Sequence, residues 1–373
     1  MRQDIIHAEI GNMEINSAMN KFEDLMEKLV ASEMTGKVTK EAFGQVDIAG
    51  YNYAAVRYGK DTEEFPNRII VGSETYPKDL DNNWTLVEQY PQLIGDFAWT
   101  AWDYLGETGI GKITYGEKQG LGFYAAYPYK AAYCGDINLI GDRRPVSFWR
   151  EIIWGFRTKP YLAVQPPQYY GIEHGMTKWS MTDAVRSWNW EGYENKPVIV
   201  ESYLDADEAE LYINGDFVEK KVVGERKKFM ALFDTVYISG IVEVVAYKNG
   251  KEIDRDSIVT AEENLKISAY ADRKEIPADE SDICYIDISI VDSLGNLNPN
   301  TDKVVTISVQ GPGIIQGYGS AAPATEENYF DKKAKAYEGR LRAAIRGTGK
   351  KGIIKISLSS EGCETVSVHV EAV

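Results

Sequence analysis

The sequence is poor in the residues that build many common metal and catalytic sites. Its 373 residues include three histidines and three cysteines. The cysteines, Cys134, Cys284 and Cys363, lie far apart, so they predict neither a disulfide framework nor a cysteine-rich zinc site. Three histidines likewise give little support to a histidine-rich metal site or a histidine-based catalytic triad.

Positive charge and long apolar runs are also scarce. Lys and Arg number 41 against 57 Asp and Glu, a formal net charge of −16. This balance disfavours nucleic acid or an anionic membrane surface as a partner, because both are bound by an excess of Lys and Arg. No run approaches the roughly 20 apolar residues of a membrane helix. Residues 1–10 carry Asp4, His7 and Glu9 and so lack the apolar core of a signal peptide.

Aromatic residues are abundant and unevenly placed. The chain has 24 Tyr, 11 Phe and 8 Trp, and no Trp follows Trp190. Hydrophobic residues make up 44% and charged residues 26%, as in a globular protein. At roughly 150 residues per domain, the length allows two or three domains. The two halves of the chain are therefore expected to be built differently.

The first half alternates helical and strand patterns. Apolar residues at three-and-four spacing predict a helix over 17–33, and β-branched runs predict buried strands. The predicted strands are 46–51, 68–72 and 93–99, and the further predicted helices are 84–89 and 145–155. Strand and helix in alternation indicate an α/β unit.

The second half changes to an alternation of period two. Prolines interrupt residues 159–195, and strands separated by Asn-Gly and other turn signals follow from residue 198 onward. Short strands at this spacing predict two β-sandwiches, at 196–263 and 264–373. Trp188-Asn189-Trp190 is expected to pack the linker against the α/β unit.

Chemistry-bearing residues follow the three buried strands. Tyr53 follows the first, Glu74 the second, and Trp99 and Asp103 the third. In a parallel α/β barrel the active site lies at these strand ends. Aromatic rings stack on the CH faces of a sugar, and a carboxylate can attack an anomeric carbon. Core aromatics beside a surface glutamate would give the same pattern.

Two longer motifs carry a family resemblance. Ile-Ile-Val-Gly-Ser-Glu-Thr at 69–75 and Gly-Asp-Phe-Ala-Trp-Thr-Ala-Trp-Asp-Tyr-Leu-Gly-Glu at 95–107 resemble glycoside hydrolase family 2, the β-galactosidase and β-glucuronidase group. Residues 47–53, 134–137 and 144–145 resemble neighbouring segments of that family. The resemblance implies a multidomain chain: the last strands of a (β/α)8 TIM barrel, followed by two immunoglobulin-like β-sandwiches. The implied domains are a barrel part at 1–165, a linker at 166–195, and sandwiches at 196–263 and 264–373.

The resemblance also implies a retaining β-glycosidase. Glu74 matches the catalytic nucleophile, which forms a covalent glycosyl-enzyme, and Tyr53 matches a tyrosine that hydrogen-bonds the nucleophile and holds it ionised. Trp99 matches an aromatic residue of the sugar-binding floor. Asp103 is a candidate for a sugar-hydroxyl contact, with a loop-anchoring carboxylate as the alternative for Asp103 and for Glu107. The residues of the two motifs are most similar to those of β-galactosidases, so a β-galactoside is the expected carbohydrate. No cofactor is required, and no ligand set for Mg²⁺ or Na⁺ is evident.

One element of a retaining mechanism has no match. The family's acid/base is the Glu of an Asn-Glu pair, and this dipeptide occurs nowhere in the 373 residues. About 160 residues precede the sandwiches, whereas a complete barrel takes about 250. We therefore expect the C-terminal part of a larger enzyme, inactive by itself. Exposed strand edges would favour pairing with the missing N-terminal part or a second chain, or self-association into a homo-oligomer.

Two other functions stay open. The sandwiches could form a non-catalytic carbohydrate-binding or adhesive module, although the intact set Tyr53, Glu74 and Trp99 favours an enzyme. A β-glucuronidase-type member is the other alternative. Glucuronidases of the family use an Asn-Lys pair, whereas Asn195-Lys196 lies near the linker and far from the strand ends in sequence.

Overall fold

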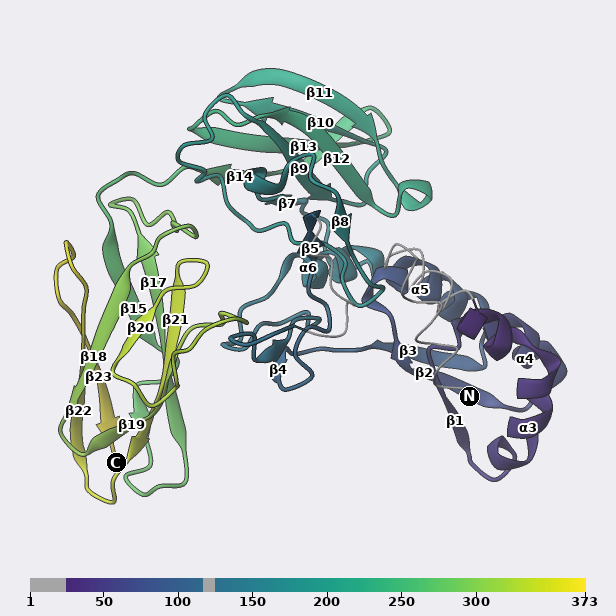
Figure 1. Ribbon diagram of the computed structural model, residues 1–373, viewed down its shortest axis with the longest axis horizontal. Helices are drawn as coiled ribbons and strands as arrows, with labels where there is room; N and C mark the ends of the chain where they lie inside the picture. The colour runs from purple at the N-terminus through teal and green to yellow at the C-terminus, as the bar shows by residue number, and fades with distance from the viewer. Residues whose placement is uncertain (1–24, 117–124) are drawn as a thin grey trace. The chain divides into compact units, whose positions relative to one another are not determined.

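The computed structural model describes residues 25–116 and 125–373 (Figure 1). The chain divides into two compact units, each made of several segments. Unit 1 contains residues 1–137, 143–157 and 171–183, and unit 2 contains residues 138–142, 158–170 and 184–373. Among the described residues, no helix combines the length and apolar character needed to cross a membrane.

Unit 1 is built on a parallel sheet. Strands β1 (Ile48–Asn52), β2 (Ile69–Thr75) and β3 (Leu93–Ala98) form a 3-stranded sheet in the order β1-β2-β3, and both pairings are parallel. Parallel neighbours need crossover connections, which α4 (Tyr58–Glu64) and α5 (Leu80–Gln89) provide. Helix α3 (Glu33–Phe43) precedes β1, and α6 (Pro145–Ile153) follows the sheet. The predicted strands and the last two predicted helices of this half are thus confirmed. Of the helix predicted at 17–33, residues 25–31 are helical and residues 17–24 lie outside the described part.

One face of this sheet is covered and the other is open. Ala49, Ile70 and Leu93 are buried with Tyr51 and Tyr58 in one cluster, against which residues of α3 and α5 pack. The exposed side chains of the same strands are apolar as well: Ile48 is 49% exposed, Ile94 54% and Phe97 65%. Within the described residues, the sheet therefore buries one apolar face and presents apolar side chains on the other. Figure 1 shows α3, α4 and α5 beside β1–β3.

The rest of unit 1 consists of long loops with short antiparallel pairs. Strand β4 (Tyr104–Leu105) pairs with β6 (Ala131–Ala132), and β5 (Thr114–Tyr115) pairs with β8 (His174–Gly175). The second pair brings residues 171–183 back to the loop that follows the parallel sheet.

The first β-sandwich of unit 2 packs a 4-stranded sheet on a 3-stranded one. The sheets have the orders β11-β10-β13-β14 and β12-β9-β7, with antiparallel pairings throughout. The strands are β7 (Tyr161–Val164), β9 (Pro197–Tyr203), β10 (Glu208–Ile213), β11 (Asp216–Val222), β12 (Met230–Val236), β13 (Ile241–Lys248) and β14 (Lys251–Val259). The predicted Asn-Gly hairpin turns are confirmed: Asn214 and Gly215 have φ of 53° and 88°, the left-handed region that such two-residue turns require.

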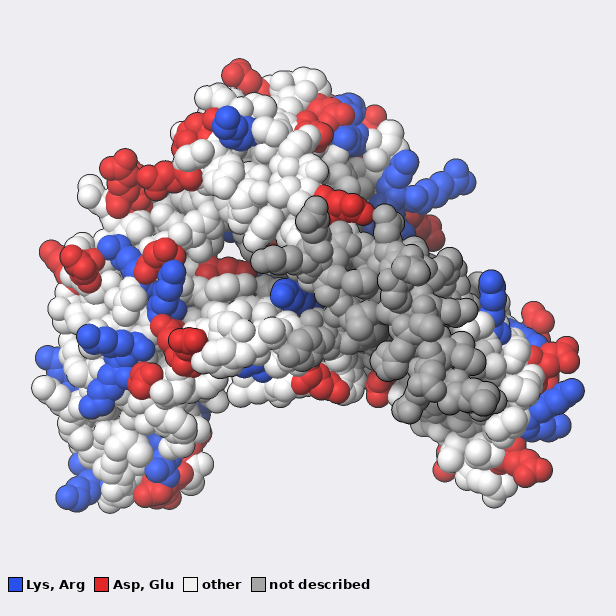
Figure 2. Space-filling model, in the orientation of Figure 1, with Lys and Arg blue, Asp and Glu red and all other residues white. Residues whose placement is uncertain are grey.

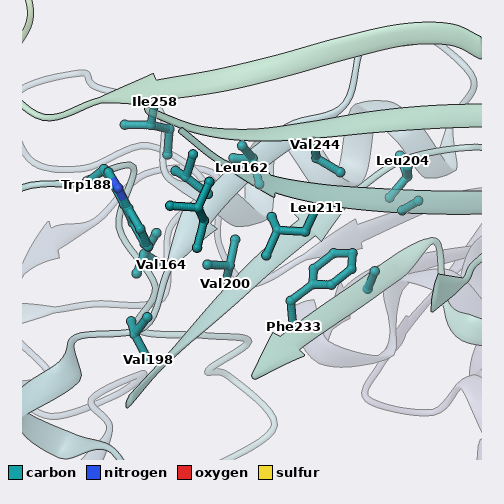
Figure 3. Close-up of a cluster of buried hydrophobic side chains, with 14 of the residues drawn as sticks. Leu162, Val164, Trp188, Val198, Val200, Leu204, Leu211, Phe233, Val244 and Ile258 are labelled. Atoms are coloured by element: carbon teal, nitrogen blue, oxygen red, sulfur yellow. The ribbon is translucent and has the colours of Figure 1, made fainter. Parts of the chain in front are cut away.

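This sandwich begins earlier in the chain than the expected boundary at residue 196. Strand β7 pairs with β9, and Leu162 and Val164 lie in the core with Val200 and Phe233 (Figure 3). Trp188, expected to pack a linker against the α/β unit, is instead buried in this same core and donates to the carbonyl of Ile238 at 2.8 Å. The composition pattern missed β7 because its run of four residues is short and is bounded by prolines.

The second β-sandwich combines a 4-stranded and a 5-stranded sheet, in the orders β15-β17-β21-β19 and β16-β23-β22-β18-β20. The first sheet contains β15 (Lys266–Ala271), β17 (Ile283–Val291), β19 (Gly313–Gly319) and β21 (Arg340–Gly347). The second contains β16 (Glu275–Ile276), β18 (Val304–Gln310), β20 (Lys333–Lys335), β22 (Gly352–Ser359) and β23 (Val366–Ala372). Isoleucines alternate with polar residues along β17, so Ile286, Ile288 and Ile290 fill the core from one strand.

Charges of both signs are intermixed on the described surface visible in Figure 2. The excess of acidic residues is therefore spread over that face, without a basic stripe on it.

Phe233→Ala tests the core of the first sandwich. Phe233 is 0% exposed, so we expect the free energy of unfolding of unit 2 to fall by about 3–5 kcal/mol, through lost burial and a residual cavity. Denaturant unfolding followed by circular dichroism measures the change. The matched control is Phe217→Ala in β11, because Phe217 is 58% exposed and its loss should cost about 1 kcal/mol or less. Equal losses for the two variants would contradict the assigned core.

Candidate active site

The parallel sheet brings the predicted strand-end residues to one edge. The Tyr53 amide donates to the carbonyl of Glu74 at 2.6 Å, and the Trp99 amide donates to the carbonyl of Thr75 at 2.9 Å. These two bonds continue the β1–β2 and β2–β3 pairings beyond the regular strands. Tyr53, Glu74 and Trp99 thus leave neighbouring strands at their carboxyl ends, the place where α/β folds carry their sites.

Tyr53 and Glu74 also interact through their side chains. The Tyr53 hydroxyl lies close enough to the Glu74 carboxylate for the two to interact electrostatically, and it accepts a hydrogen bond from Nε1 of Trp179 at 3.1 Å. Burial, and secondly the negative charge of Glu74, raise the pKa of Tyr53 above its ordinary value. Tyr53 is therefore neutral at any physiological pH. Its φ of 51° is unusual for a residue with a Cβ and marks a sharp exit from β1.

Trp99 is held by a short chain of polar groups. Its Nε1 donates to the Tyr104 hydroxyl at 3.1 Å, and the two rings meet edge to face with centroids 5.9 Å apart. Tyr104 in turn donates to the carboxylate of Glu107. Glu107 is exposed, so this chain runs from the Trp99 ring to a surface carboxylate and fixes the orientation of the indole.

Asp103 is a buried loop anchor. It is 3% exposed, and its Oδ1 accepts from the Gly135 amide at 2.7 Å and from Nη1 of Arg144 at 3.3 Å. The two segments approach so closely that a Cβ on Gly135 would lie 2.3 Å from the Asp103 nitrogen. Of the two roles expected for Asp103, the structure describes the loop-anchoring one.

A buried carboxyl lies against β2, the strand that carries Glu74. Oδ2 of Asp96, from β3, accepts from the Thr75 hydroxyl at 2.8 Å and from Nδ2 of Asn83 at 3.5 Å. Oδ1 accepts from the Tyr58 hydroxyl at 3.2 Å. A Cβ on Gly72 would lie 2.2 Å from the Tyr58 hydroxyl and 2.5 Å from Oδ1 of Asp96, so the Val-Gly-Ser-Glu sequence needs its glycine here. Asp96, missed by the sequence analysis, thereby fixes the end of β2, where Thr75 follows Glu74.

Trp179 is a second residue that the sequence analysis missed. It lies in a segment assigned to the linker, yet its ring contacts Tyr53 and Tyr76, with centroid distances of 5.6 Å and 4.9 Å. Tyr53, Tyr76 and Trp179 form one wall of a cavity of about 290 Å³. Among the four predicted site residues, Tyr53 lines this cavity, while Glu74, Trp99 and Asp103 do not. No signal in the sequence links Trp179 to a strand end more than a hundred residues earlier.

Metal ligation finds no support in the part of the chain that the structure describes. No group of three or more His, Cys, Asp or Glu side chains is arranged there to hold an ion.

Comparison with known proteins identifies the family. Residues 267–369 match glycoside hydrolase family 2 C-terminal domain 5, and residues 195–254 match a domain of unknown function. A β-galactosidase of Bacteroides ovatus is 28% identical over 294 residues, which cover 77% of this chain and 29% of that protein. A glycosyl hydrolase family 2 member from Bacteroides cellulosilyticus has a solved structure with 32% identity and a TM-score of 0.80, covering 88% of this chain and 42% of that one. The chain belongs to glycoside hydrolase family 2.

More particularly, the chain corresponds to the C-terminal portion of the family's proteins. It spans less than half the length of these relatives. A putative β-glucuronidase of Formosa agariphila is 24% identical over 267 residues. The matching region covers 70% of this chain and 22% of that protein. A β-glycosidase from Bacteroides vulgatus, 17% identical with a TM-score of 0.66, shares the fold.

Asp103 gives a pH-dependent test of the loop anchor. Burial raises its pKa from 3.8 to about 6, although Arg144 and the Gly135 amide act in the opposite direction. Because the folded-state pKa lies above the unfolded value, the folded protein takes up this proton first as the pH falls. The free energy of unfolding should therefore rise from pH 6 down to pH 4, by an Asp103 contribution of the order of 2 kcal/mol.

The matched variant is Asp103→Asn, which keeps an acceptor for Gly135 and has no charge to titrate. Denaturant unfolding of both proteins between pH 4 and pH 7 measures the difference, and other buried carboxyls such as Asp96 contribute equally to both. If the difference in unfolding free energy between the parent protein and Asp103→Asn stays the same across this pH range, the assigned environment of Asp103 is wrong.

Proposed function

We propose that this chain carries the nucleophile part of a retaining β-glycosidase of β-galactosidase type, acting on terminal β-D-galactosides. The observation that carries the proposal is the Tyr53–Glu74 pair at the carboxyl end of β2: a carboxylate at a strand end with a neutral tyrosine hydroxyl beside it. Glu74 attacks the anomeric carbon and forms a covalent glycosyl-enzyme, which water then hydrolyses. Trp99, with its indole fixed by Tyr104, offers its ring to the CH face of the sugar.

The proposed reaction needs a second carboxyl group. A retaining glycosidase has two, about 5–5.5 Å apart, and the second protonates the leaving oxygen and later activates water. We propose that this acid/base comes from barrel strands that this chain does not supply. The apolar side chains Ile48, Ile94 and Phe97 on the open face of the sheet support this proposal, because a closed barrel buries such residues in its interior.

On this proposal, residues 1–165, without β7, are the last part of a (β/α)8 barrel. The two sandwiches that follow are immunoglobulin-like in architecture. The choice of galactoside follows the Bacteroides ovatus relative. The Formosa agariphila relatives, named β-glucuronidases, make a β-glucuronide the second candidate.

Turnover of an aryl β-galactoside tests the proposal. We expect no meaningful activity from the chain alone, because it lacks the expected acid/base, and activity when it is mixed with a polypeptide that supplies the remaining barrel strands. Glu74→Gln should reduce the activity of the mixture by about 10³-fold or more, because the amide cannot form the glycosyl-enzyme. Asp81→Asn, at the first turn of α5, is the matched control and should leave the rate unchanged.

Three results would count against parts of the proposal. Robust turnover by the chain alone would refute the need for a second carboxyl from elsewhere. Full activity of Glu74→Gln would refute the nucleophile. If the chain with its partner cleaves the aryl β-glucuronide in preference to the galactoside, the proposed substrate is wrong, while the proposed mechanism is unaffected.

A further inference from the structure

Two Asn-Gly dipeptides form turns of the same kind in the first sandwich. Asn214-Gly215 connects β10 to β11, and Asn249-Gly250 connects β13 to β14. Each is a two-residue loop with positive φ at both positions: 53° and 88° in the first turn, 52° and 71° in the second. All four residues are exposed. The two turns are therefore a matched pair, in which the surroundings of the asparagine side chain can be compared.

An asparagine that precedes a glycine can lose its side-chain amide without an enzyme. The backbone nitrogen of the glycine gives its proton to water and attacks the asparagine Cγ, an approach that no glycine Cβ obstructs. The Cγ–Nδ2 bond then breaks and Nδ2 leaves as ammonia, so that a succinimide ring remains. Water opens this ring at one of its two C–N bonds and gives aspartate or isoaspartate.

In the first turn, the amide of Asn214 is held by both of its polar atoms. Its Oδ1 accepts from the Ile241 amide at 2.8 Å, and its Nδ2 donates to the carbonyl of Ser239 at 3.0 Å. The side chain also packs on Gly240, where a Cβ would lie 2.0 Å from Oδ1. To present its Cγ to Gly215, Asn214 has to break both hydrogen bonds, and each of them raises the activation barrier.

In the second turn, the amide of Asn249 makes no side-chain hydrogen bond to the part of the chain that the structure describes. Its backbone alone is fixed, because its N–H donates to Oδ2 of Asp207 at 2.6 Å. The space around Gly250 is open, since a Cβ there would meet no atom within 4 Å. No contact among the described residues therefore holds the Asn249 Cγ away from the Gly250 nitrogen.

The charges near the second turn offset one another. Lys248 and Lys251 flank the dipeptide in sequence. Asp205 lies 3.0 Å from Nζ of Lys248, and Asp207 contacts the backbone of the turn. Two cations thus stand against two carboxylates, so no net negative charge opposes the loss of the Gly250 amide proton.

We infer that Asn249 is a site of spontaneous deamidation and that the side-chain hydrogen bonds of Asn214 protect the equivalent position in the other turn. Water is the co-reactant, and ammonia is the second product. The inference goes beyond the proposed function, because this reaction needs neither Glu74 nor a carbohydrate.

The modification weakens the hairpin of β13 and β14. Isoaspartate carries the main chain through its side-chain carbon, so it lengthens a loop whose geometry suits two ordinary residues. Its free carboxylate also adds negative charge at a position whose backbone nitrogen lies 2.6 Å from Asp207. Strand β14 pairs with β13 and places Ile258 in the core. The modified protein should therefore unfold at a lower denaturant concentration than the fresh protein.

Peptide mapping of the full chain tests the inference. The protein is incubated in a mildly alkaline buffer and digested at intervals. Chromatography with mass spectrometry then separates the peptides that carry asparagine, aspartate or isoaspartate at positions 214 and 249. We expect Asn249 to react about tenfold or more faster than Asn214, equivalent to about 1.4 kcal/mol in activation free energy. The chain unfolded in urea is the control for local sequence, and there the two rates should lie much closer together.

Two variants test the cause of the difference. Gly240→Ala places a Cβ against Oδ1 of Asn214, so it should raise the rate at Asn214 and leave the rate at Asn249 unchanged. Asn249→Gln should abolish the reaction at its own position, because glutamine has to close a larger ring, and should leave the slow rate at Asn214 unchanged. Thermal unfolding of each variant checks its fold. If Gly240→Ala is unfolded, the comparison of the parent with and without urea decides the question.

Each outcome has a definite reading. Modification of Asn249 in the folded chain, with a rate ratio over Asn214 that falls in urea, supports the inference. Folded protein in which Asn249 stays intact while the chain in urea reacts overturns it, as do equal rates at the two positions. A ratio that urea leaves unchanged overturns it too, because the fold would then play no part.

Discussion

The buried carboxyl of Asp96 holds together the part of the molecule on which its chemistry depends. It lies under β2, where Gly72 leaves space for it, and it collects hydrogen bonds from three different elements: Tyr58 of α4, Thr75 of β2 and Asn83 of α5. Burial raises its pKa, and the hydroxyl donors act against that shift. A buried carboxyl is stable only where such partners surround it, so strand, helices and carboxyl fix one another.

Asp96 orders two elements of unit 1, β2 and α5. Thr75 follows Glu74 directly, so the bond from Thr75 to Asp96 positions the end of the candidate nucleophile strand. Asn83 of α5 donates to the same carboxyl. One carboxyl therefore orders both the end of the strand that carries Glu74 and the helix that carries Asn83.

The sequence predicted those parts of the fold in which local pattern and tertiary packing agree. Ile69, Ile70 and Val71 read as a buried strand and form one, and the alternation along β17 matches its buried and exposed faces. It did not predict α3, in which Met34 is 63% exposed and Val38 75% exposed. This helix depends on the Ser32 cap, and Arg57 donates to the carbonyls of Val30 and Ser32 just before it. That contact is invisible to a periodicity argument.

In the candidate site, too, residues beside a recognisable strand could be predicted, whereas residues that depend on long-range contacts could not. Glu74 and Tyr53 could be predicted, because each follows a recognisable strand and parallel strands end at one edge. Trp179 could not be predicted, because its importance arises from a contact with Tyr53 across more than a hundred residues. Asp103 was found by its motif, but only its burial distinguishes a loop anchor from a ligand contact.

The path of the chain between the units constrains how the protein can be made and cut. After a short first passage through unit 2 at residues 138–142, the chain enters it again at residue 158 to form β7. It then returns to unit 1 for residues 171–183 and enters unit 2 for the third time at residue 184. On a ribosome, β7 therefore emerges more than thirty residues before its partner β9, and it has to wait unpaired while unit 1 is completed. No single peptide bond divides the two units, so a protease cut at the compositional border near residue 196 would leave the first sandwich without the strand that closes its smaller sheet.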